Sequence, residues 1–143
     1  WGWTARARST GAWQDAAVHA IDTPARLHRR GVVHGDVKPA NVLLRAPDAP
    51  VLTDFGLARN VGAPTAGGSP GYVSPERLDG APVDPRDDVY GFGRVIEDLL
   101  DAVGADELRS LAEACLCPAE RRLADGDAIM AALDGRVTGE GPR

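Results

Sequence analysis

The hydrophobic positions of this chain repeat with a helical period in its second half and form short runs in its first half. Seven apolar residues recur at helical spacing between positions 89 and 103, which indicates a largely buried helix. Apolar residues at intervals of three and four predict two further helices, over 108–116 and around 129–133. The second half therefore supplies most of the predicted core.

The first half predicts an interrupted helix followed by short extended segments. Residues 16–21 have a helical pattern, and a second helical stretch runs from Pro24 to Arg30 and ends at Gly31. Because Asp22-Thr23-Pro24 places a capping residue before a proline, we expect a kink or a restart of the helix there. Three brief apolar runs, 32–33, 42–44 and 51–53, predict short strands. Glycine and proline are dense between 60 and 88, so we expect a long irregular segment.

Composition adds limits on the class of protein. The 143 residues are enough for one globular domain, and no apolar run is long enough to cross a membrane. The net charge of −5 argues against nucleic acid and anionic membrane surfaces as partners. Cys115 and Cys117 are too close in sequence to form an unstrained disulfide and too few for a zinc site, so we interpret them as buried small apolar residues in a reducing compartment. Lys38 is the only lysine.

The candidate chemistry lies in two polar loops. The loop HGDVKPAN, residues 34–41, holds an acid (Asp36), a cation (Lys38) and an amide (Asn41), and a second acid, Asp54, precedes Phe55 and a glycine. Two carboxylates and an amide provide the hard oxygen ligands that Mg²⁺ prefers, and a nearby lysine can neutralise phosphate charge. The pattern indicates phosphate chemistry with a divalent cation.

Four motifs in order make the sequence resemble the eukaryotic-like serine/threonine protein kinases of bacteria. They are HGDVKPAN at 34–41, DFG at 54–56, GSPGYVSPE at 68–76 and DVYGFG at 88–93. The resemblance implies a mainly α fold (α+β overall), namely a protein-kinase-like large lobe that is helical with a few short strands, with the small lobe absent. It divides the chain into an irregular lead-in (1–15), the large lobe (16–134) and a flexible tail (135–143).

The resemblance also implies a role for each candidate residue. Asp36 is similar to the catalytic aspartate that accepts the substrate hydroxyl proton, and Lys38 to the lysine that contacts the γ-phosphate of ATP. Ser69 resembles the hydroxyl residue that hydrogen-bonds both of them. Asn41 and Asp54 resemble the pair that holds Mg²⁺, so ATP and Mg²⁺ are the implied cofactors.

Further residues resemble structural supports of such a site. His34 and Phe55 are similar to packing residues under the two loops, and Asp88 to the acid at a helix start that holds the catalytic-loop backbone. The resemblance implies a buried ion pair between Glu76 and a late arginine, for which the sequence offers Arg121.

The sequence also departs from the family pattern. The residues before His34 are too few for a small lobe, and the only lysine already belongs to the catalytic loop, so we expect this chain to bind ATP poorly by itself. Gly35 stands where most members carry arginine, which argues against switching by phosphorylation of the loop that follows. Only a short connection separates Leu100 from Asp106, in place of the usual substrate-docking helix.

These observations lead to three hypotheses. The first is a cytoplasmic protein kinase that phosphorylates Ser or Thr of protein substrates. It would be a truncated catalytic domain, weak or inactive alone, whose small lobe is missing or supplied by another chain. The second is an inactive kinase-like module for binding or regulation, and the third is a small-molecule phosphotransferase. A lobe cut from its partner would expose an apolar patch, which Trp1, Trp3 and Trp13 would partly cover.

Overall fold

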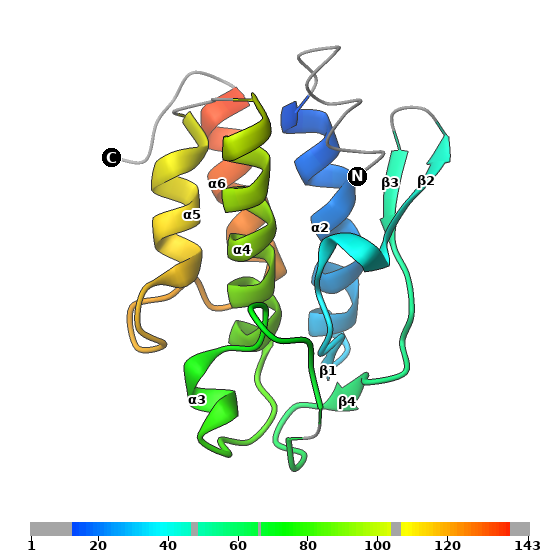
Figure 1. Cartoon of the computed structure of the whole chain (residues 1–143), viewed down its shortest axis with the longest axis vertical. Coiled ribbons are helices and arrows are strands. Elements are labelled where there is room, and N and C mark those ends of the chain that lie inside the picture. The colour runs from blue at the N-terminus through cyan, green and yellow to red at the C-terminus, as the bar shows by residue number, and fades with distance from the viewer. Residues whose placement is uncertain (1–12, 47–48, 66, 104–106, 138–143) are drawn as a thin grey trace.

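Four long helices lie side by side and make up most of the computed structural model, which describes residues 13–46, 49–65, 67–103 and 107–137 (Figure 1). They are α2 (Trp13–Arg29), α4 (Pro85–Val103), α5 (Glu107–Leu116) and α6 (Gly126–Val137). Helix α4 packs mainly against α5, and α2 mainly against α6. None of the described helices combines the length and the apolar character needed to cross a membrane.

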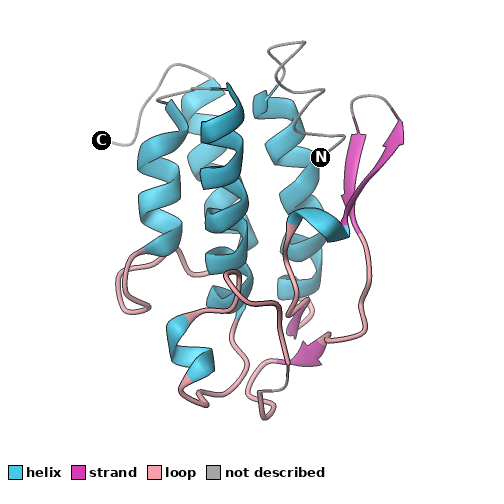
Figure 2. Ribbon diagram, viewed as in Figure 1, coloured by secondary structure: helices cyan, strands magenta, loops and turns pink. Residues whose placement is uncertain are grey.

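Short strands and loops lie along one side and one end of these helices (Figure 2). Strand β1 (Val32–Val33) pairs antiparallel with β4 (Arg59–Asn60), and β2 (Val42–Ala46) pairs antiparallel with β3 (Ala49–Leu52). A 3₁₀ turn, η1 (Pro39–Asn41), precedes β2, and the short helix α3 (Pro75–Leu78) precedes α4. The predicted mainly α fold with a few short strands is confirmed.

The core forms where the apolar faces of the long helices meet. Ile21 of α2, Phe92 and Ile96 of α4, Leu111 of α5 and Leu133 of α6 are all almost completely buried. Their spacing within each helix follows the 3.6-residue period, which turns one face of each helix inward. The core supports a long α4 whose first turn lies directly under the polar loops.

Helix α2 differs from the prediction because it passes through Pro24 without restarting. Proline removes one backbone N–H from the helical ladder, so the continuity depends on packing rather than on intrinsic propensity. Helix α6 packs very closely on α2 at this level: a Cβ on Gly126 would lie 2.6 Å from the Cα of Ala25. Of the two predicted outcomes at Asp22–Thr23–Pro24, a kink or a restart, the restart is therefore wrong.

Element boundaries also differ from the sequence-based ones. Helix α2 starts at Trp13, inside the predicted lead-in, and α6 continues through Gly135 to Val137, inside the predicted tail. Residues 1–12, with Trp1 and Trp3, and residues 138–143 lie outside the described part of the chain. The irregular segment predicted over 60–88 contains α3, which the sequence analysis missed.

Candidate active site

The backbone of the polar loop 34–41 is fixed from below by one buried carboxylate. Asp88, in the first turn of α4, accepts hydrogen bonds from the amide of His34 (2.8 Å to Oδ2) and from the amide of Gly35 (2.9 Å to Oδ1). Asp88 is 1% exposed. Hydrogen bonds to a buried charged acceptor are stronger than neutral ones. The support predicted for Asp88 is confirmed.

A buried histidine completes the surroundings of Asp88. The Nδ1 atom of His28 accepts a hydrogen bond from the amide of Gly126 (2.9 Å), so its proton is on Nε2, which lies 2.8 Å from Asp88 Oδ2. His28 comes from the end of α2 and Gly126 starts α6. Three helices therefore meet at the carboxylate that holds the loop.

Four of the five predicted site residues form one connected group, which we call the Asp36 cluster: Asp36, Lys38, Asn41 and Ser69. Ser69 Oγ donates to Asp36 Oδ1 (2.8 Å), and Lys38 Nζ donates to Ser69 Oγ (2.6 Å) and lies 3.6 Å from Asp36 Oδ2. Asn41 Nδ2 donates to the carbonyl of Asp36 (2.8 Å) and to its Oδ2 (3.2 Å). The contacts predicted for Ser69 with Asp36 and Lys38 are confirmed.

The fifth predicted residue, Asp54, comes from a segment that is bonded to the same loop. The amide and the hydroxyl of Thr53 both donate to the carbonyl of Asn41, at 2.7 and 3.0 Å. Asp54 follows directly, with a positive φ of 62°, and its Oδ1 accepts the amide of Gly56 (3.2 Å). These bonds place the two predicted metal ligands on neighbouring backbone segments.

His34 and Phe55 also join the two segments. His34 Nδ1 accepts from the amide of Asp36 (3.1 Å), so its Nε2 donates to the carbonyl of Thr53 (2.9 Å). The ring of Phe55 meets His34 edge to face at 5.3 Å between centroids. His34 is completely buried, and Phe55 is 50% exposed. His34 is thus buried between the two loops as predicted, whereas Phe55, predicted as a packing residue, touches His34 but leaves half of its surface exposed.

Asn41 and Asp54 each have an oxygen that could bind a divalent cation. Asn41 is buried, and its Oδ1 receives no hydrogen bond within the part of the chain that the structure describes, because both of its bonds to Asp36 use Nδ2. One carboxylate oxygen of Asp54, Oδ2, is likewise left open within that part. No group of three or more His, Cys, Asp or Glu side chains able to hold a metal occurs among the described residues. A cation here would use the Asn41 amide oxygen with the Asp54 carboxylate, and both are hard ligands that suit Mg²⁺.

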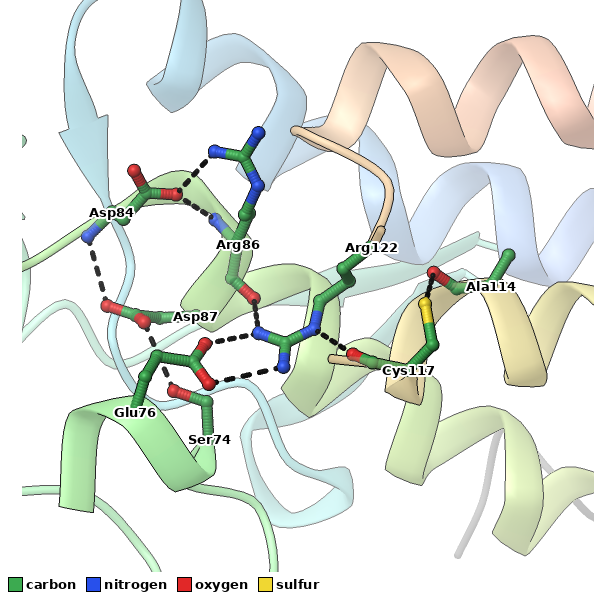
Figure 3. Close-up of polar contacts among 8 residues, drawn as sticks. All are labelled: Ser74, Glu76, Asp84, Arg86, Asp87, Ala114, Cys117 and Arg122. Atoms are coloured by element: carbon green, nitrogen blue, oxygen red, sulfur yellow. Dashed lines mark hydrogen bonds and ion pairs between the residues drawn. The ribbon is translucent and has the colours of Figure 1, made fainter. Parts of the chain in front are cut away.

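A second polar group anchors the far end of the segment that carries Ser69 (Figure 3). Arg122 binds Glu76 with two nitrogens: Nη1 contacts Oε1, and Nη2 donates to Oε2 at 3.2 Å. The same guanidinium donates to the carbonyls of Cys117 (3.1 Å) and Arg86 (3.2 Å). Burial alone would raise the pKa of Glu76, but the hydrogen bonds and charge of Arg122, together with hydrogen bonds from a backbone amide and from Ser74, outweigh it and lower this pKa below its ordinary value.

The partner of Glu76 is therefore Arg122, and the prediction of Arg121 is wrong. The turn after Pro118 decides between the two adjacent arginines: the amides of Arg121 and Arg122 both bond back to the carbonyl of Pro118. In this turn the side chain of Arg122 is 1% exposed, whereas Arg121 is on the surface. The sequence analysis located the arginine in the correct turn but chose Arg121 rather than the adjacent Arg122.

Sequence reasoning missed two residues that the structure brings to this region. Arg77, in α3, is buried and donates to the carbonyl of Gly35 (2.6 Å), and its Nε donates to Thr65 Oγ1 (2.9 Å). His28 was not singled out as a partner of Asp88. Neither residue belongs to a local pattern, since their partners lie far away in sequence.

Comparison with known proteins finds a matching family model and several similar curated proteins. The family model described as "Protein kinase domain" matches residues 9–103. Among curated proteins, the chain is 46% identical over 88 residues to the serine/threonine-protein kinase PknK of Mycobacterium bovis, a match that covers 58% of this chain and 8% of that protein. It is 43% identical over 88 residues to the serine/threonine-protein kinase PkaA of Streptomyces coelicolor, over 55% of this chain and 16% of that protein. The matches thus span only a small part of these relatives.

A solved structure supports the fold. The Cydia pomonella granulovirus kinase PK-1 superposes on this chain with a TM-score of 0.65 at 22% sequence identity, over 81% of this chain and 57% of that one. At this identity the likeness concerns the fold alone. It fits the helical lobe with small sheets that the sequence predicts.

Proposed function

Because this chain belongs to the protein kinase domain family, we propose that it carries the phosphoryl-transfer centre of a serine/threonine protein kinase. The observation that supports this most is the Asp36 cluster, in which a carboxylate, an amine, an amide and a hydroxyl converge within hydrogen-bond distance. The curated relatives are named serine/threonine-protein kinases, which supports Ser and Thr hydroxyls as the groups that receive the phosphate. The proposal includes protein substrates with Ser or Thr and a cytoplasmic location.

In this proposal Asp36 orients the substrate hydroxyl and accepts its proton. Its carboxylate already receives Ser69 at Oδ1 and Asn41 at Oδ2, and these bonds fix its plane. A carboxylate offers about four acceptor positions, so room remains for one more hydroxyl donor. Its side chain is 12% exposed, which leaves an approach from solvent. A fixed base of this kind typically contributes about 10²–10⁴-fold to a rate.

Asn41 and Asp54 are proposed to hold Mg²⁺ with ATP through the oxygens described above. A cation held there would supply positive charge that screens the charge developing on the phosphates during transfer. Lys38 lies beside Asp36, and a displacement of its Nζ from Ser69 would let it face a terminal phosphate. The contact with Ser69 keeps Lys38 next to the position proposed for the substrate hydroxyl at Asp36.

The nucleotide site is proposed to be completed by residues outside this chain. The exposed side chains of Leu43 and Phe55 leave apolar surface open near the polar loops. Beside Phe55 lies a hollow of about 440 Å³ that is also lined by residues of α2 and β3. With Lys38 as the only lysine, no second lysine of this chain can reach the other phosphates. A small lobe, in the same product or on another chain, would supply these contacts and cover the surface.

A non-catalytic regulatory module is the second candidate, and the lysine count is the observation that favours it. The single amine is already engaged with Ser69 and Asp36, so metal binding without turnover would also fit the cluster. The two candidates differ in one measurable respect, because only the kinase needs Asp36 as a base.

The experiment measures ATP binding and phosphate transfer by the 143-residue chain, alone and with a protein kinase small lobe added, because the proposal assigns part of the nucleotide site to such a lobe. ATP is titrated with and without Mg²⁺, and transfer from radiolabelled ATP to a mixed Ser/Thr peptide library is followed. We expect Asp36→Asn to lower transfer by about 10²–10⁴-fold with little change in ATP affinity. The matched control Asp79→Asn removes an exposed carboxylate and should leave transfer unchanged.

Each other outcome contradicts the proposal in a defined way. Mg²⁺-dependent ATP binding without transfer would support the regulatory module. Transfer to soluble hydroxyl compounds but not to peptides would support a small-molecule phosphotransferase. Transfer that survives Asp36→Asn would remove the proposed base.

A further inference from the structure

Arg77 is a charged side chain that is buried beneath the polar loop 34–41. It belongs to the four-residue helix α3, yet it is only 6% exposed, and its guanidinium points under the polar loop to the carbonyl of Gly35. Burying a guanidinium is costly unless its donors are bonded. Its known acceptors belong to two different segments, one before Asp36 and one before Ser69.

The first acceptor belongs to the peptide that leads into Asp36. The carbonyl of Gly35 receives Arg77 Nη1 at 2.6 Å, and the N–H on the other side of the same peptide plane, that of Asp36, donates to His34 Nδ1 at 3.1 Å. Both polar groups of the plane are therefore fixed. Because a peptide is planar, its orientation sets the direction in which the Asp36 side chain leaves the backbone.

Gly35 makes this arrangement possible. Its φ is +86°, and a Cβ at this position would lie 2.7 Å from the carbonyl of Leu57 and 3.5 Å from Arg77 Nη2. An L-residue here would be strained and would collide with the neighbouring backbone. The absence of a side chain at position 35 leaves the space beneath the loop to the guanidinium of Arg77.

The second acceptor belongs to the segment that carries Ser69. Arg77 Nε donates to Thr65 Oγ1 at 2.9 Å, and four residues later Ser69 contacts both Asp36 and Lys38. One rigid, planar guanidinium thus spans both segments. Lysine would keep the charge but cannot reproduce the fixed fork of donors.

We propose that Arg77 is a positioning residue that couples the Gly35–Asp36 peptide to the Thr65–Ser69 segment. It orders the base and the serine that contacts it as one unit, without contact with the reacting atoms. The effect of Arg77 on phosphate transfer rests on the proposed function. The coupling of the two backbone segments does not, and it can be measured without a transfer assay.

The test measures amide hydrogen exchange and phosphate transfer in variants of the full 143-residue chain. In Arg77→Lys, we expect exchange in the peptides that cover 35–41 and 67–71 to rise at least about tenfold, because one ammonium group cannot bond the Gly35 carbonyl and Thr65 Oγ1 together. Exchange in the core of α4 should remain unchanged within about a factor of two. Arg121→Lys, at an exposed neighbour of the other buried arginine, serves as the control and should change neither region.

Variants of Thr65 keep the test decisive if changes at Arg77 prevent folding. Thr65→Val removes the acceptor without leaving the guanidinium wholly unbonded, and it should raise exchange at 35–41, on the other side of Arg77. Thr65→Ser retains the hydroxyl and should restore protection. Unchanged exchange at 35–41 in Thr65→Val, or an equal rise over all core helices, would overturn the coupling.

The transfer assay separates this inference from the proposed function. If the unmodified chain transfers phosphate, Arg77→Lys and Thr65→Val should lower kcat more than KM for ATP, and Thr65→Ser should recover kcat. An unchanged kcat would overturn the positioning role. If neither the unmodified chain nor any variant transfers phosphate even with a small lobe added, the proposed function fails, and the exchange data still decide whether Arg77 couples the two segments.

Discussion

Replacement of Arg122 by methionine tests the buried ion pair that anchors the segment before α4. Arg122→Met removes the guanidinium but keeps a side chain of similar length, and Glu76 stays in place without its cation. Arg121→Met is the matched control, because Arg121 is the next residue along the chain and is exposed. The two variants have the same net charge and composition, so they differ only in position.

The expected magnitude follows from what Arg122 contacts. The side chain is 1% exposed and is bonded to Glu76 and to two backbone carbonyls, and its Cζ lies 5.1 Å from the ring centroid of Tyr90. Breaking a buried pair costs about 3–5 kcal/mol. Because the Glu76 side chain is 28% exposed and can be partly hydrated, we expect the lower end, about 3 kcal/mol. For a domain of this size that corresponds to a fall in Tm of about 10 °C.

Thermal and urea unfolding followed by circular dichroism measure this difference. The Arg121→Met control should stay within about 0.5 kcal/mol of the unmodified chain. The double variant Glu76→Leu/Arg122→Met should recover much of the loss, because a pair replaced by apolar side chains leaves no buried charge. Equal stability of Arg122→Met and Arg121→Met would refute the argument that this pair anchors the segment.

The same pair gives a pH dependence of known sign. The pKa of Glu76 is lower in the folded chain than its ordinary value of 4.5, so the unfolded chain binds more protons between these two values. The contribution of the pair is complete above pH 4.5 and is lost as the pH falls through the folded-state pKa. The stability difference between the unmodified chain and Arg122→Met should therefore shrink from pH 7 toward pH 3. A difference that stays constant over this range would contradict the assignment.

Two further substitutions test the support of the polar loop. Asp88→Asn should cost about 2–3 kcal/mol in urea unfolding, because the amides of the loop lose a charged acceptor, whereas the exposed control Asp79→Asn should cost almost nothing; a loss shared equally by both would contradict the role of Asp88. Gly91→Ala should lower stability by about 1–2 kcal/mol despite the better helix propensity of alanine, because a Cβ at this position would lie 2.8 Å from the carbonyl of Val37. The exposed helix substitution Glu113→Ala is its control, and a stabilised Gly91→Ala variant would show that α4 does not press against the loop.

The fold could be predicted from the sequence where a period was long enough to define a face. Helix α4 is the best case, since Val89, Phe92 and Ile96 recur at helical spacing and all three are buried. Helix α3 could not be found in this way, because four residues are too few to show a period. At Pro24 the local signal was misleading, because packing of α6 outweighed the preference of proline for a helix start.

The same distinction applies to the candidate site: contacts within a short loop or motif could be predicted, and contacts between distant segments could not. The Asp36 cluster could be predicted because three of its members lie within one short loop and Ser69 belongs to a motif. The inward arginine could not be chosen from two adjacent ones, because only the turn after Pro118 sets which side chain faces the core. Arg77 left no sequence signal, since its acceptors lie far from it along the chain.

The hydrogen bonds that hold the polar loop 34–41 connect the candidate active site to distant parts of the chain. The amides of His34 and Gly35, before Asp36, are held by Asp88, which in turn contacts His28. The other ring nitrogen of His28 accepts the amide of Gly126, the first residue of α6, so only three hydrogen bonds separate the last helix from the loop. Loss of α6 would remove the donor that fixes the His28 tautomer and would also open the face of α2 against which α6 packs. Order in the candidate active site therefore depends on a helix that contributes no residue to the Asp36 cluster.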